Sequence, residues 1–102
     1  MGIGFYRTVR VKEGCAERFQ RLMLGYAKAI SMYEPGCTFH ATSRSTTDPL
    51  EFTVHEEYAD RGALEFHRTS DHKRLWLPVI LREVASVSVS CFAVQEEDAV
   101  RS

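Results

Sequence analysis

The sequence has no long apolar run and no concentration of charge of one sign. None of its apolar stretches approaches the roughly 20 residues of a membrane span, and the opening segment MGIGFYRTVR lacks the apolar centre of a signal peptide. Tyr6 stands where a myristoylation signal requires Ser or Thr. The net charge is -1 and the basic residues are scattered, so no basic stripe is available for nucleic acid. We therefore expect a cytoplasmic protein with no nucleic-acid or membrane partner.

Cysteine is also scarce, and the familiar catalytic and metal motifs are missing. Cys15, Cys37 and Cys91 are an odd number without CxxC spacing, which favours reduced thiols over a disulfide scaffold. His67 and His72 are five residues apart, which on one continuous helix separates them by about 140°. Without closely spaced ligand pairs we predict no metal site. The sequence contains no GxSxG, GxGxxG or phosphate-binding loop.

Seven segments carry the periodicity of regular structure within an ordinary globular composition, 44% apolar and 26% charged. Asp60 and Ser70 are suitable N-caps for two short helices, of which Pro78 bends the second. Pro35-Gly36 ends the long helix, because the residue before proline avoids helical angles and glycine accepts positive φ. The patterns predict strands over 3–12, 37–44, 50–58 and 84–94, and helices over 16–33, 60–67 and 70–81.

This order, β-α-β-β-α-(α)-β, predicts an α+β fold of the ferredoxin-like type. Four antiparallel strands form one sheet, and the helices cover one of its faces. The segment 84–94 alternates strictly and has no strongly charged side, although its uncovered face would meet solvent. We therefore expect a second subunit to cover that face, giving a homodimer. A single domain is predicted over residues 1–94, followed by a polar tail over 95–102.

Two charged residues break the strand pattern. Arg7 falls on the apolar face of the first strand, and Glu56 falls on the apolar face of the third. In a ferredoxin-like sheet these strands are central neighbours, so both side chains point beneath the helices. A buried charge without a partner costs several kcal/mol. Two interpretations are compatible: a structural Arg7–Glu56 ion pair, and a polar spot within an apolar small-molecule cavity.

The histidines and the single tryptophan allow structural and chemical interpretations. His67 lies at the buried edge of its predicted helix, as a structural residue or as a proton acceptor near neutral pH. Trp76 is a core residue or the wall of a cavity for a planar ligand. His72 follows closely behind Ser70 and is expected to be exposed. His40 and His55 are expected on the side of the second subunit, with no chemical role.

Four segments resemble the antibiotic biosynthesis monooxygenase domain family. They are the turn-containing segment EPGCTFHATSRSTTDPLEF (34–52), the run HEEYADRGALEFHRTSDH (55–72), VRVKEGCAERF (9–19) and the closing alternating strand. The resemblance covers about residues 3–94. It implies ferredoxin-like dimers whose two sheets close into an α/β barrel, with a pocket between each sheet and its helices.

The resemblance also implies a chemistry. Typical members oxygenate phenols or quinols with dioxygen and use neither flavin nor metal, so no cofactor is expected. A deprotonated aromatic polyol is electron-rich enough to reduce oxygen, and the protein supplies an apolar cavity and a proton acceptor. His67 matches the histidine of the family's AL-x-x-H run, and Tyr58 matches the aromatic residue that ends the third strand.

A second branch of the family degrades haem with an asparagine on the first strand, a tryptophan and a histidine. This chain contains no asparagine; Arg7 occupies the asparagine position and Tyr58 the tryptophan position. Haem degradation is therefore disfavoured, whereas Arg7 remains suited to stabilise a phenolate.

We predict cofactor-independent oxygenation of a hydroxylated aromatic or quinol, with a small aromatic substrate and dioxygen as partners. His67 is the predicted base or orienting group, Arg7 the anion stabiliser, and Glu56 the group that orients Arg7. The alternatives are a binding module or isomerase with the same pocket, haem binding, and a purely structural dimer without a cavity. The predicted substrate-binding residues are Phe5, Phe52, Tyr58, Phe66, His72 and Trp76.

Overall fold

The computed structural model describes residues 2–95 and places seven elements in the predicted order. The predicted boundaries agree with the structure to within one residue. Residues 96–102 of the predicted polar tail lie outside the described part. No helix of residues 2–95 is long and apolar enough to cross a membrane. The strands are β1 (Ile3–Val11), β2 (Cys37–Arg44), β3 (Glu51–Tyr58) and β4 (Val84–Ala93), and the helices are α1 (Ala16–Tyr33), α2 (Arg61–Arg68) and α3 (Asp71–Leu81).

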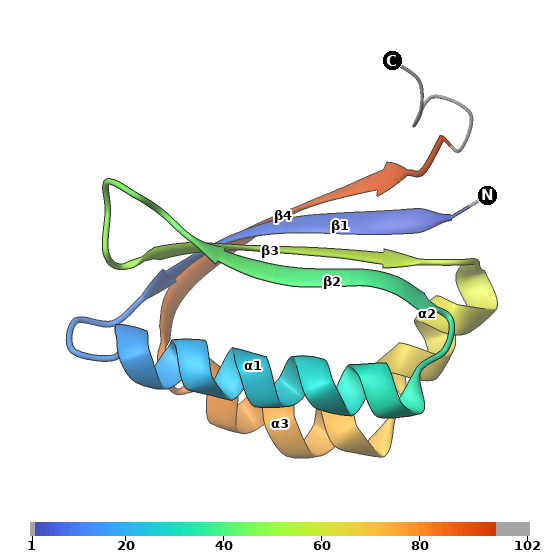
Figure 1. Cartoon of the computed structure of the whole chain (residues 1–102), viewed down its shortest axis with the longest axis horizontal. Helices are drawn as coiled ribbons and strands as arrows, with labels where there is room; N and C mark the ends of the chain where they lie inside the picture. Colours follow the sequence, from blue (N-terminus) through green and yellow to red (C-terminus); the bar gives the residue numbers. More distant parts are fainter. Residues whose placement is uncertain (1, 96–102) are drawn as a thin grey trace.

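The four strands form one antiparallel sheet in the order β2-β3-β1-β4. The helices lie on one side of this sheet, with α1 and α3 next to each other (Figure 1). This is the predicted ferredoxin-like α+β arrangement. The central strands β1 and β3 carry Arg7 and Glu56 beneath the helices as diagonal neighbours, because Arg7 pairs with Val54 and Glu56 pairs with Phe5.

The core lies between α1 and the central strands. Apolar residues recur along α1 every three or four positions, so that they share one face of the helix. Burying one such side chain contributes about 1.5–3 kcal/mol. The buried face of α1 consists of Phe19, Met23, Tyr26 and Ile30, and it packs with Val9, Val11, Phe52, Val54 and Ile80 in one cluster.

The short helices begin at the predicted caps. Asp60 Oδ1 accepts a hydrogen bond from Ala63 N at 2.8 Å, and Ser70 Oγ accepts one from Lys73 N at 3.3 Å. Each cap satisfies a backbone donor that has no partner inside its helix.

Gly36 has a different role from the predicted one. It does not adopt positive φ, which among the glycines of the described residues occurs only at Gly14. A Cβ at Gly36 would instead lie 2.5 Å from the Cβ of Ala63. Gly36 is therefore required because α2 approaches the backbone after α1 very closely.

The sheet face opposite the helices carries an aromatic cluster centred on His55. Phe39 and Phe92 lie 4.7 and 5.8 Å from the His55 ring, and Tyr6 lies 6.0 Å from it, measured between ring centroids. Tyr6 and Phe39 are each 45% exposed and Phe92 is 37% exposed. A face with this much accessible apolar surface is suited to contact with another protein surface.

Candidate active site

A cavity of about 240 Å³ lies between the sheet and the helices. Its presence is contrary to the purely structural alternative, which predicted a closed interior. Strands β1, β3 and β4 supply one wall, and the three helices supply the others. The lining residues are mostly apolar: Phe5, Val9, Phe19, Met23, Val54, Leu64, Leu77, Ile80, Leu81, Val84 and Val87, with Arg7, Tyr26, Glu56, His67, Arg68 and Lys73 as the polar ones.

Arg7 and Glu56 form the predicted ion pair on the sheet wall of this cavity. Arg7 NH1 lies 3.0 Å from Glu56 Oε1, with the Glu56 side chain 7% exposed and that of Arg7 34% exposed. Both residues line the cavity, so the structural and the cavity interpretation hold together. The half-buried guanidinium lies where it can face a bound anion, while Glu56 fixes its orientation.

Tyr58 lies behind the cavity wall and supports Glu56. Its hydroxyl donates a hydrogen bond to Glu56 Oε1 at 3.0 Å, and the side chain is fully buried. Burial, followed by the nearby Glu56 carboxylate, raises the pKa of Tyr58, so Tyr58 stays a neutral donor. It does not line the cavity, and its ring lies 5.2 Å from that of His67.

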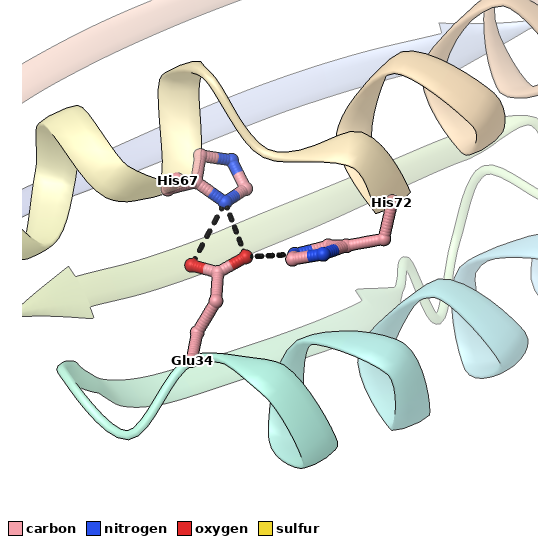
Figure 2. Close-up of side chains that lie close together, drawn as sticks. All are labelled: Glu34, His67 and His72. Carbon is pink, nitrogen blue, oxygen red and sulfur yellow. Dashed lines mark hydrogen bonds and ion pairs between the residues drawn. The ribbon is translucent and has the colours of Figure 1, made fainter.

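His67 is held by a carboxylate that the sequence analysis did not identify. Its Nδ1 lies 3.0 and 2.9 Å from the two carboxylate oxygens of Glu34, and His72 Nε2 contacts Glu34 Oε2 from the other side (Figure 2). All three side chains are buried. An ionised carboxylate only accepts hydrogen bonds, so His67 carries a proton on Nδ1. In a neutral ring this leaves the lone pair on Nε2.

The second nitrogen of His67 lies near a tyrosine hydroxyl. His67 Nε2 lies 3.5 Å from the hydroxyl of Tyr26, and both residues line the cavity. Burial, with a smaller effect of Glu56, raises the pKa of Tyr26. Tyr26 therefore remains protonated at neutral pH and can donate a hydrogen bond near the imidazole. His67 has the arrangement of an oriented general base.

Three helix ends bring this triad together. Glu34 is the C-cap residue of α1, His67 lies in the last turn of α2, and His72 lies in the first turn of α3. Ser70 fixes the turn between α2 and α3, because its hydroxyl donates to His67 O at 2.8 Å and accepts from the next helix. The close contact at Gly36 allows α2 to lie against the end of α1.

The position of Glu34 in the sequence indicates that its side chain is buried. It follows Tyr26 and Ile30 at intervals of eight and four residues, which places it on the apolar stripe of α1. A carboxylate at such a position requires buried partners. The prediction that His72 is exposed is wrong, because its imidazole is one of those partners.

The predicted position of His40 is also wrong. His40 pairs with Glu56 in the β2–β3 register, so both side chains point beneath the helices. His40 Nε2 lies 3.7 Å from Glu56 Oε2, and its ring meets the Tyr26 ring edge-on. Strand β2 has no clearly apolar face. Its one large apolar residue, Phe39, lies beside His55 on the sheet face opposite the helices. The sequence of β2 therefore favoured the opposite orientation.

The remaining predicted substrate-binding residues divide into two groups. Phe5 lines the cavity, whereas Phe52 is buried in the core against Phe19 and Trp76 packs on Gly25 of α1. Phe66 is 54% exposed. Successive helical residues point about 100° apart, so α2 cannot direct both His67 and Phe66 inward. The structure places Phe52, Phe66 and Trp76 away from the cavity surface.

Glu34, His67 and His72 also form a set of donors that suits a metal ion. One ligand atom from each lies within 4.8 Å of the others, and two imidazoles with a carboxylate bind divalent transition metals. The same atoms also form hydrogen bonds with one another, because both imidazoles contact the Glu34 carboxylate. The buried polar groups are therefore satisfied without a metal ion as well.

The comparisons with known proteins agree with this architecture. Residues 3–77 match the model of the family described as antibiotic biosynthesis monooxygenase. The chain belongs to this family. The comparison with curated proteins gives no match.

Solved structures share the fold over nearly the whole chain. A protein from Caulobacter crescentus CB15, described as a "putative antibiotic biosynthesis monooxygenase", is 27% identical, with a TM-score of 0.85 and coverage of 92% of this chain and 91% of that one. A protein of the same description from Nitrosomonas europaea is 20% identical, with a TM-score of 0.84 and coverage of 93% and 91%. A conserved protein from Methanosarcina mazei Go1 is 21% identical, with a TM-score of 0.83 and coverage of 93% and 94%.

Proposed function

We propose that this protein is a cofactor-independent monooxygenase that oxidises a hydroxylated aromatic or quinol in the cavity beneath its helices. The observation that carries the proposal is the orientation of His67. Its Nδ1 is bound to the buried carboxylate of Glu34, and its Nε2 lies near the hydroxyl of Tyr26, a residue that lines the cavity together with His67. Membership of a family named for monooxygenases supports the same reaction.

The substrate itself supplies the electrons in this reaction. His67 Nε2 accepts the hydroxyl proton, and the resulting phenolate ring is electron-rich enough to react with dioxygen. One oxygen atom forms a bond to a ring carbon and the other leaves as water, so a phenol becomes a quinone. The substrate loses four electrons and dioxygen gains four, which makes an external reductant unnecessary. The Glu34 carboxylate stabilises the protonated imidazole during this step.

The sheet wall stabilises the anion that deprotonation creates. Arg7 lies in the cavity with its guanidinium oriented by Glu56, which Tyr58 holds from behind. The apolar walls exclude water and strengthen these interactions. The volume of about 240 Å³ is below the range of roughly 300–1,000 Å³ typical of drug-sized ligands. It favours substrates of one or two rings and disfavours a haem macrocycle.

Replacing His67 tests the proposal directly. His67→Ala should lower oxygen consumption with a one- or two-ring quinol by at least about a hundredfold, the usual contribution of a general base. An oxygen electrode measures the rate, and circular dichroism checks the fold. The matched control is Phe66→Ala, which removes the exposed neighbouring side chain and should leave the rate unchanged. Equal rates for His67→Ala and the wild type would remove His67 from the mechanism.

Glu34→Gln tests the positioning role of the buried carboxylate. The amide keeps the shape but cannot stabilise the protonated imidazole by charge. We expect kcat to fall by about tenfold or more, while the substrate still binds. The acidic limb of the pH–rate profile should move to lower pH, which a purely structural role would not cause. An unshifted profile with a lower rate throughout would assign Glu34 to structure alone.

Chelation distinguishes base catalysis from metal catalysis at the same three residues. We expect protein treated with a strong chelator, and checked for metal by mass spectrometry, to consume oxygen at the untreated rate. Loss of activity that iron(II) or another divalent metal restores would instead make Glu34, His67 and His72 ligands. Quinol binding with no oxygen consumption in either sample would favour the binding or isomerase alternative.

A further inference from the structure

We infer that the ligand of this cavity carries a permanent negative charge, such as a ring carboxylate, in addition to its reacting hydroxyl group. The inference rests on the proposed function only in taking this cavity as the substrate site. Its basis is the charge of the lining. Arg7, Arg68 and Lys73 line the cavity with a single carboxylate, Glu56, and so the lining carries three positive charges and one negative charge. The whole chain, in contrast, has a net charge of -1.

The excess positive charge lies on the helix wall. On the sheet, Arg7 is paired with Glu56 at 3.0 Å, so this wall has no surplus charge. Arg68 ends α2, and Lys73 lies in the first turn of α3, so both flank the turn that follows His67. Within residues 2–95, Arg68 forms one ion pair, with Glu65, and both side chains are at least half exposed. Ion pairs of this kind contribute little. An anion at this wall would therefore meet two cations and no competing carboxylate of the lining.

Lys73 occupies an unfavourable position unless an anion is near, because Asp71, the acidic residue of the same turn, pairs with Arg74 instead. Positive charge in the first turn of a helix opposes the helix dipole. None of the ion pairs formed within residues 2–95 includes Lys73. Its partly buried side chain instead lines the cavity. A bound carboxylate would provide the missing partner and would benefit from the same dipole.

The combination of apolar walls and surplus cations selects a particular ligand class. Apolar surfaces bind the ring, and the cations bind a negatively charged substituent by charge-assisted hydrogen bonds. A hydroxylated aromatic carboxylate has both properties. Its hydroxyl group faces His67 while its carboxylate lies against Arg68 and Lys73, which are carried by the same pair of helices.

The test compares 1-hydroxy-2-naphthoate with 1-naphthol, which share ring size and hydroxyl position and differ in charge. Binding is measured by calorimetry at neutral pH, low salt and without oxygen. We expect the naphthoate to bind about tenfold more tightly, and this preference should decrease as added salt screens the cations. Equal affinities, a preference for the neutral ligand, or no binding of either compound would overturn the inference.

Substitutions on the helix wall test which residues cause the preference for the charged ligand. Lys73→Gln and Arg68→Gln should each reduce the ratio of the two affinities about threefold or more, and the double variant should bring this ratio close to one. The matched control is Arg74→Gln, which removes a neighbouring cation that pairs with Asp71 outside the lining. If the double variant still prefers the charged ligand, residues other than Arg68 and Lys73 cause the preference. Because binding is measured without turnover, an intact preference in a protein that consumes no oxygen would reject the proposed function alone.

Discussion

Two buried carboxylates organise the site. Glu56 is held by Arg7 and Tyr58 on the sheet, and Glu34 is held by His67 and His72 at the helix ends. Each arrangement compensates the cost of removing a charge from water. The sheet carboxylate contacts the Arg7 guanidinium, and the helical carboxylate contacts the His67 imidazole. The proposed anion-binding and acid–base groups therefore have separate supports.

His40 provides a prediction about pH and stability. Burial is the largest effect on this residue and lowers the pKa of His40 below its ordinary value of 6.5, although the nearby Glu56 acts in the opposite direction. The unfolded chain then binds more protons than the folded one, so stability is complete above the unfolded pKa and decreases as the pH falls below it toward the folded pKa. Urea midpoints measured from about pH 8 to about pH 5 should fall.

A substitution at His40 tests whether this residue causes the loss of stability at lower pH. His40→Gln removes the titrating group, and its urea midpoint should fall less over the same interval than that of the wild type. Tyr26, which contacts the ring, stays protonated throughout because its pKa is raised. Parallel curves for the variant and the wild type would show that another group causes the acid sensitivity.

At the scale of elements, the site is assembled where α1 ends and α2 passes over it. The sequence predicted these helices, their caps and the break between them, because each depends on local patterns of a few residues. It could not predict that Gly36 serves a close contact with Ala63, since a contact across the fold leaves no local pattern. The partnership of Glu34 with His67 remained hidden for the same reason, although His67 itself was identified.

Gly36→Ala tests whether this contact positions the triad. The added methyl group would lie 2.5 Å from the Cβ of Ala63, so α2 must move and we expect a loss of about 1–3 kcal/mol. The melting temperature should fall and oxygen consumption should decrease with it. The matched control is Gly62→Ala, whose nearest contact is Asp60 Oδ1 at 3.4 Å and which should be neutral or stabilising. Equal melting temperatures for both variants would mean that α2 tolerates displacement.

At the scale of the whole molecule, the sheet has one face that residues 2–95 leave uncovered. The predicted fold order was confirmed because every strand carried its own periodic signal. The orientation of β2 was not, because its one large apolar residue, Phe39, faces away from the helices, and only the pairing with β3 reveals this. The aromatic cluster around His55 lies on the uncovered face, and we propose that a second copy of the chain covers it.

Tyr6→Glu tests this assembly. A charge within an apolar contact between two sheets should convert the expected homodimer into monomers, which light scattering coupled to size exclusion measures. The control is Leu24→Glu, which introduces the same charge at a residue of α1 that is 62% exposed on the helical side. A monomeric wild type, or a Tyr6→Glu dimer, would contradict the proposed interface.

The separation between strand-borne and helix-borne residues has an evolutionary consequence. Phe5 and Val54 shape the cavity from the sheet, whereas Glu34 holds His67, the proposed proton acceptor, at the helix ends. Substitutions at the strand positions can enlarge, narrow or reshape the cavity without changing the His67 imidazole or the Glu34 carboxylate. Under the proposed function, single changes on the strands would alter which substrates fit and would leave the proposed base in place.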